Sequence, residues 1–213
     1  MSLPPPHAPI SFRAAALRTV LYILFMGAIA QGTYLEALYL PGSRFSEWGL
    51  TELTQTLFLA VSCVLLLYIR HGLRVWPNVT LLLSAFLAAS LVREQDAFLD
   101  TYVADNTWKV LVALIVLPSL YWVGRNRQRF LAEFTYFSNS FSFGFFVSGL
   151  LVTYVFSRLY GRQEFWLTVL EENYVRTFKN VAEEVMELLG YALILIAVVE
   201  LVILARRWRM ANS

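Results

Sequence analysis

Apolar residues fill six long stretches of the chain, and polar residues with proline or glycine occur at several of the joints between them. About 20 apolar residues in an α-helix, at about 1.5 Å of rise each, cross the roughly 30 Å hydrocarbon core of a bilayer. Each stretch is therefore expected to form a transmembrane helix. The pattern predicts six such helices, over Thr19–Leu40, Trp48–Ile69, Trp76–Asp100, Asp105–Val123, Phe134–Phe156 and Glu183–Ala205.

The composition of the 213 residues indicates the same class of protein. Apolar residues make up 58% of the chain and charged residues only 15%, whereas a water-soluble domain carries roughly 25% charged residues. This excludes a soluble globular enzyme and a disordered chain. The expected fold is an all-α integral membrane protein, a six-transmembrane-helix bundle, with a tail over 1–18, a transmembrane domain over 19–205 and a basic tail over 206–213.

The positions of the arginines predict the orientation of the bundle. Ten of the 17 basic residues lie in the two tails and in the second and fourth loops, and all ten are arginine. Short loops rich in Lys and Arg stay in the cytoplasm, so both termini are expected there, in a membrane that we expect to be the bacterial cytoplasmic membrane. These arginines are Arg13, Arg18, Arg70, Arg74, Arg125, Arg127, Arg129, Arg206, Arg207 and Arg209.

Thirteen of the 15 acidic residues fall toward the opposite side. Acidic residues contribute little to insertion, so this asymmetry needs another cause. Counting helical rise outward from the arginines places ionisable groups of five helices roughly 3 to 7 Å below the outer edge of the hydrocarbon. Because a charge facing lipid there costs a few kcal/mol, we expect these groups to turn inward around a polar cavity. They are Glu36, Glu52, Arg93, Glu94, Lys109 and Glu187.

Helical spacing selects the residues of this cavity, because positions three or four apart share a helix face. The ligand-binding or proton-accepting candidates are Glu52, Gln55, Glu94, Asp96, Glu184 and Glu187. Arg93 and Lys109 are the expected charge partners. With two histidines and one cysteine in the chain, a zinc site of the usual kind is not expected. Carboxylates of Glu52, Glu94 and Glu187 would instead suit a divalent cation such as Ca²⁺, Mg²⁺ or Mn²⁺.

Two further patterns bear on packing. Ser140, Gly144 and Ser148 recur every four residues, a small-residue face that allows another helix to approach closely. In the loop over 158–180, the aromatic and apolar residues Trp166, Leu170, Tyr174 and Phe178 also recur every four residues. This periodicity predicts an interfacial amphipathic helix between the fifth and sixth spans, lying over the cavity, although a connecting loop with aromatic anchors would show similar residues.

Three functional hypotheses follow for the cavity. The leading one is an outward-opening, carboxylate-rich pocket that binds a cation, a proton or a cationic headgroup, for transport or ligand sensing. A second is an enzyme embedded in the membrane, using carboxylates for acid/base or divalent-metal chemistry on a lipid or lipid-linked substrate. A third is a non-catalytic subunit of a membrane complex. The expected partners are the lipid bilayer and a second copy or another membrane protein, without nucleic acid. Headgroup solvation or purely structural ion pairs would explain the same charges without a site.

Overall fold

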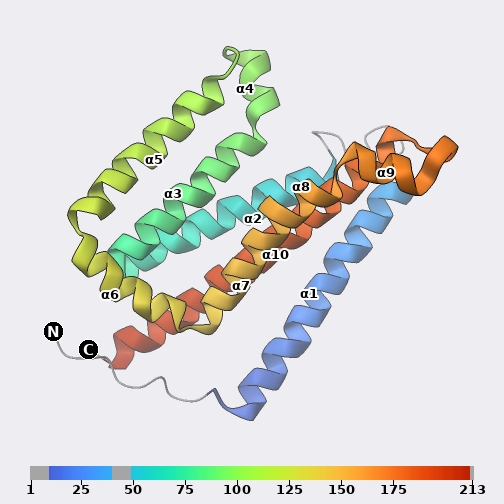
Figure 1. Ribbon diagram of the computed structural model, residues 1–213. Coiled ribbons are helices and arrows are strands. Elements are labelled where there is room, and N and C mark those ends of the chain that lie inside the picture. Colours follow the sequence, from blue (N-terminus) through green and yellow to red (C-terminus); the bar gives the residue numbers. More distant parts are fainter. Residues whose placement is uncertain (1–9, 40–48, 212–213) are drawn as a thin grey trace.

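The computed structural model describes residues 10–39 and 49–211, and these two ranges contain helices and no strand. Figure 1 shows long helices running side by side, with α10 against α2 and α7, and with α5 and α1 on opposite flanks. The helices are α1 Phe12–Tyr39, α2 Leu50–Leu67, α3 Pro77–Glu94, α4 Asp96–Tyr102, α5 Thr107–Arg125, α6 Arg127–Ser138, α7 Phe141–Leu150, α8 Ser157–Tyr160, α9 Gln163–Leu170 and α10 Arg176–Ala211. Two π-helical turns, η1 Tyr68–Leu73 and η2 Leu151–Phe156, and a 3₁₀ turn, η3 Glu171–Asn173, complete the order.

Five helices of the described ranges are long and apolar enough to cross a membrane, which makes the chain compatible with a multi-spanning membrane protein. These are Phe12–Tyr39, Leu50–Leu73, Thr107–Arg125, Phe141–Tyr160 and Arg176–Ala211. The helix at the third predicted span, α3, is not among them, because its 18 residues include Asn78 at one end and Arg93 and Glu94 at the other. The number of spans and their orientation remain predictions.

Several helix boundaries differ from the predicted ones. The third span was expected to continue to Asp100, but α3 ends at Glu94 and α4 starts after the non-helical Gln95. The fifth span was expected to begin at Phe134, which lies in α6 instead. A new helix begins at Phe141, because Ser140 is extended and its hydroxyl accepts a hydrogen bond from the amide of Phe143. The last helix starts before Glu183 and runs through Ala211.

The loop over 158–180 does not form one amphipathic helix. Trp166 and Leu170 lie on the eight-residue α9, whereas Phe178 already belongs to α10. The helix stops because Glu171 has a φ of 49°, in a region that side-chain-bearing residues rarely adopt, and because Tyr174 is extended. Side chains that are regularly spaced in the sequence therefore belong to two separate helices.

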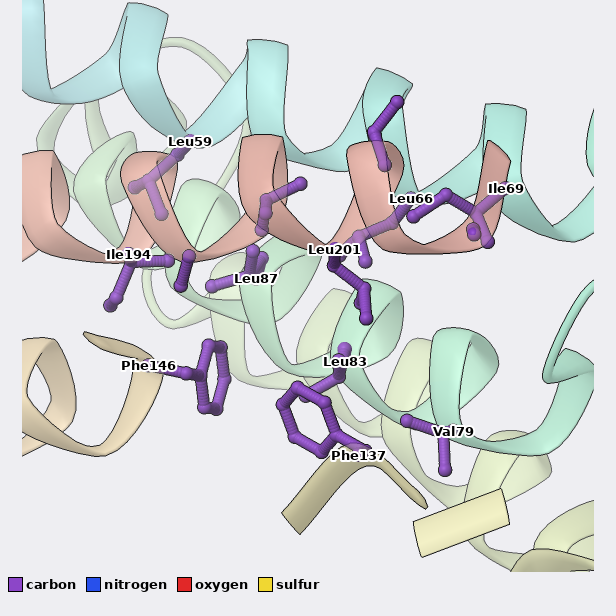
Figure 2. Packing of buried hydrophobic residues seen from close by; sticks show 14 of the residues in the cluster. Leu59, Leu66, Ile69, Val79, Leu83, Leu87, Phe137, Phe146, Ile194 and Leu201 are labelled. Atoms are coloured by element: carbon purple, nitrogen blue, oxygen red, sulfur yellow. The ribbon is translucent and has the colours of Figure 1, made fainter. Parts of the chain in front are cut away.

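The core lies where α10 meets α2 and α7, with α3 packed against α2. Figure 2 shows apolar side chains of these helices converging, with Phe137 of α6 joining them; the labelled residues include Leu59, Leu66, Leu87, Phe146, Ile194 and Leu201. In a bilayer, lipid tails are as apolar as leucine, so helix association depends on close packing and polar contacts rather than on removal of apolar surface from water.

Two glycines allow the closest helix contact. A Cβ at Gly149 of α7 would lie 2.6 Å from Cγ1 of Ile194, and one at Gly190 of α10 would overlap the hydroxyl of Thr153. The predicted small-residue face is not the one used here: Gly144 and Ser148 are exposed. Contact between copies of the chain through that face remains a prediction.

Candidate functional site

A cavity of about 900 Å³ lies at one end of the bundle, where α2 and α10 begin and α3 ends. Figure 1 shows α4, α8 and the first turns of α2 and α10 at this end. Among the residues that the structure describes, nine charged side chains line the cavity: the acids Glu52, Glu94, Asp96, Glu183, Glu184 and Glu187, and the bases Arg93, Arg158 and Lys179. When all are ionised, the lining carries an excess of three negative charges.

The cavity brings together most of the side chains that the sequence singled out. Glu52, Glu94, Asp96, Glu184 and Glu187 all line it, together with Arg93. Gln55 lies one turn after Glu52 on α2 and is fully buried. Its amide nitrogen donates hydrogen bonds to the backbone oxygen of Glu184 at 3.0 Å and to the carboxylate of Glu184 at 3.1 Å. Gln55 therefore positions the Glu184 side chain from the neighbouring helix.

A hydrogen bond from α10 to α3 holds one acid of the cavity, Glu94. Glu184, Glu187 and Tyr191 follow one face of α10 at spacings of three and four. The hydroxyl of Tyr191, which is 1% exposed, donates to Glu94 Oε1 at 2.7 Å. Arg93 Nη2 lies 3.9 Å from the same oxygen, at the outer limit of an ion pair. Glu94 is thus held mainly by the tyrosine.

One side of the cavity contains a compact ion-pair cluster. Arg158 Nη1 lies 2.6 Å from Glu183 Oε1, and Arg158 Nη2 lies 2.7 Å from Glu187 Oε1. Lys179 Nζ lies 2.7 Å from the second oxygen of Glu183. Two of the three bases that line the cavity are therefore engaged by Glu183 and Glu187.

Arg158 reaches this cluster because of the local backbone. It is the second residue after the π-helical turn η2, and a π turn shifts the register of every later side chain relative to an uninterrupted α-helix. The same turn packs at Gly190, which brings α8 close to the first turns of α10. The guanidinium then meets two carboxylates of α10.

On the other side of the cavity, carboxylates outnumber basic side chains. Its carboxylates belong to Glu52, Glu94, Asp96 and Glu184. Asp96 accepts a hydrogen bond from the amide of Ala97 at the start of α4, and Glu184 from the Gln55 amide. These neutral donors satisfy oxygen atoms without cancelling charge. Counted over the described residues of the lining, the negative excess therefore lies on this side, where Arg93 is the one base beside four acids.

Two predicted members of the layer lie elsewhere. Lys109 on α5 is exposed, and its ammonium group lies 5.5 Å from the centre of the neighbouring Trp108 ring. Glu36 is buried, and its carboxylate accepts hydrogen bonds from the amide and hydroxyl of Thr51 at 2.8 and 2.5 Å, at the start of α2. Helical rise assigned both residues to the same layer as the acids of the cavity, but neither side chain lines the cavity.

Within the described ranges, no group of three or more His, Cys, Asp or Glu side chains is arranged to hold a metal ion. Glu52, Glu94 and Glu187 share the cavity without forming such a group. The Ca²⁺, Mg²⁺ or Mn²⁺ hypothesis therefore has no geometric support. No residue of α9 lines the cavity either, so α9 is not a lid over it in this structure.

Sequence reasoning missed the two basic groups of the ion-pair cluster. Lys179 could have been found, because it precedes Glu183 by four residues, the spacing of a helical ion pair. Arg158 could not, because its partners are 25 and 29 residues away and depend on the π turn.

Comparison of the chain with protein-family models, curated proteins and solved structures gave no match. The functional argument therefore rests on the cavity itself. A ligand would contact the charged side chains of the cavity, and its size would be limited by the volume of the cavity.

Proposed function

We propose that the chain is a multi-spanning membrane protein that binds a cation in the carboxylate-rich cavity, for transport or for ligand sensing. The observation that carries this proposal is the lining of the cavity, whose described residues supply six carboxylates and three basic groups. Clefts lined by one sign of charge and walled by low-dielectric protein concentrate ligands of the opposite sign. A bound cation would relieve the repulsion between the acids of α2, α3 and α10.

An organic cation fits the cavity better than a bare metal ion. Its volume of about 900 Å³ falls within the range of pockets that enclose small organic molecules. The described residues offer no ready-made metal centre. Phe98 and Tyr102 line the same cavity, and aromatic faces attract organic ammonium groups. We therefore propose a substituted ammonium compound as the ligand.

The distribution of charge along the bundle supports an outward-facing cavity. Arg125, Arg127, Arg206 and Arg207 lie at the ends of α5, α6 and α10 remote from the cavity. Under the positive-inside rule this arginine-rich end would face the cytoplasm, and the cavity would open on the other side of a bacterial cytoplasmic membrane.

Thermal unfolding in a non-ionic detergent tests the proposal. Tetramethylammonium chloride should raise the unfolding temperature of the wild-type protein more than sodium chloride of equal ionic strength does. Glu184→Gln keeps the shape of the side chain and removes its charge, so it should weaken the apparent affinity at least tenfold. Glu164→Gln, in α9 and outside the cavity lining, is the matched control and should respond as the wild type does. A flat response of the wild-type protein to organic, monovalent and divalent cations would contradict the proposal.

A membrane-embedded enzyme is the second candidate, favoured by the hydrogen bond between Tyr191 and Glu94. A tyrosine hydroxyl on a carboxylate can move a proton, and Arg93 and Arg158 in the same cavity could bind an anionic group. Incubation with a membrane lipid extract, followed by mass spectrometry, should then show a product that Glu187→Gln fails to form while keeping its fold. No change in any lipid would count against this candidate.

A further inference from the structure

Apolar side chains border the carboxylates of the cavity. Leu53, Phe98 and Tyr102 line the same cavity as Glu52 and Glu94, and they are 53%, 50% and 70% exposed. The rings of Phe98 and Tyr102 lie 4.8 Å apart, one turn from each other on α4. We call these three residues the apolar rim. The cavity is therefore two-sided, with a charged wall and an apolar border.

We infer that the ligand is an amphiphile: an ammonium group held among Glu52, Glu94 and Glu184, and an alkyl chain lying on the apolar rim. This inference rests on the proposed function and adds the chemical class of the ligand. A small hydrophilic cation would leave the rim as exposed as it is now. An alkyl chain covers it, and each buried CH₂ strengthens binding about fourfold.

Charge and position favour this occupant of the rim. The rim adjoins the acidic side of the cavity, away from the cluster in which Arg158 and Lys179 engage Glu183 and Glu187. An anionic amphiphile would meet the excess of carboxylates. A neutral one would leave that excess uncompensated. A chain that carries a positive charge at one end matches both surfaces.

A matched pair of probes tests the inference. Tetramethylammonium and hexyltrimethylammonium share one charged group, and only the second has a chain; hexanol supplies the chain without charge. Binding is measured by thermal unfolding in non-ionic detergent. We expect hexyltrimethylammonium to bind at least tenfold more tightly than tetramethylammonium, and hexanol to bind to neither the wild-type protein nor Glu184→Gln.

Variants of the rim locate the chain. Phe98→Ala and Tyr102→Ala should each reduce the advantage of hexyltrimethylammonium several-fold and leave tetramethylammonium binding unchanged. Val110→Ala, an exposed apolar residue of α5 outside the cavity lining, is the control and should keep the full advantage. If Phe98 and Tyr102 only anchor the protein at the membrane surface, neither rim variant will change the advantage, and the inference is wrong.

The outcomes separate this inference from the proposed function. Equal binding of the two ammonium probes would overturn the amphiphile and leave cation binding standing. Binding of neither probe would overturn both. A second arm, in nanodiscs with and without a two-chain trimethylammonium lipid, identifies the source of the ligand: competition with the short probe indicates a membrane lipid, and its absence indicates a soluble amphiphile.

Discussion

Glu133 and Glu187 are both buried carboxylates, but the groups that satisfy them differ in kind. Glu133, 6% exposed, accepts hydrogen bonds from the backbone amides of Asn78 and Val79 at 2.7 and 3.0 Å. These amides open α3, so the acid of α6 caps a helix N-terminus. Glu187, 3% exposed, instead meets the side chains of Arg158 and Ser157.

This difference separates structural acids from candidate functional acids. The amides at a helix N-terminus are fixed by the backbone and carry the positive end of the helix dipole, so they hold a carboxylate in one position. Glu36 of α1, which accepts a hydrogen bond from the amide of Thr51 at the start of α2, is a second example. Side-chain partners such as Arg158 can rotate away and be replaced by a ligand. Burial alone therefore does not identify the site, whereas the nature of the hydrogen-bond donors does.

The largest effect is expected from removal of the structural acid. Glu133→Ala leaves two backbone amides and the Asn78 side chain without their acceptor, and it also removes the partner of Arg129. Each buried donor without an acceptor costs about 1 to 3 kcal/mol, so the loss of acceptor for these three donors should lower the free energy of unfolding by at least about 3 kcal/mol. Chemical unfolding in detergent measures it. Cation affinity of the folded fraction should be unchanged; a stable variant that no longer binds would reverse the assignment.

A smaller loss of stability is expected at the contact between α1 and α10. Glu200 of α10 is 5% exposed, lies 2.7 Å from Arg18 Nη1 and accepts a hydrogen bond from the hydroxyl of Tyr22. Glu200→Leu should cost about 2 kcal/mol, less than loss of a fully buried ion pair, because Arg18 near the helix end can turn toward water. Unfolding of α1 before the rest should appear as faster proteolysis near the N-terminus. Arg13→Gln, on the exposed side of the same helix, serves as the control, and equal proteolysis of the two variants would argue against this role.

The helical class and the gathering of acids at one end follow from local features that the sequence displays directly. Runs of apolar residues specify helices, and distance along a helix specifies height, so Glu52, Glu94 and Glu187 could be assigned to one layer. Gln55 was found in the same way, because it shares a helix face with Glu52. These inferences need no knowledge of which helices touch.

The direction in which a side chain points around its helix could not be inferred in this way. Lys109 was expected among the acids, but it is exposed on α5 and does not line the cavity. The breaks at Gln95 and Ser140 lie inside long apolar runs, which hide them. Arg158 enters the cavity only because of a π turn and a glycine contact with α10. The position of Arg158 depends on contacts between residues distant in the sequence, which residue spacing alone does not encode.

The smallest effect on stability, and the most direct test of the cavity, is expected from substitution of Arg158. Its guanidinium already occupies the position of a cation between Glu183 and Glu187. Arg158→Gln raises the negative excess of the lining from three to four charges, so tetramethylammonium should bind several-fold more tightly, most clearly at low salt where screening is weak. Stability without ligand should fall by about 1 kcal/mol, because the side chain of Arg158 is 42% exposed and exposed ion pairs contribute little. Arg162→Gln, a nearby charge outside the lining, should change neither quantity. Weaker binding by Arg158→Gln would mean that the guanidinium itself holds the ligand, and the cavity would then belong with anion-binding sites.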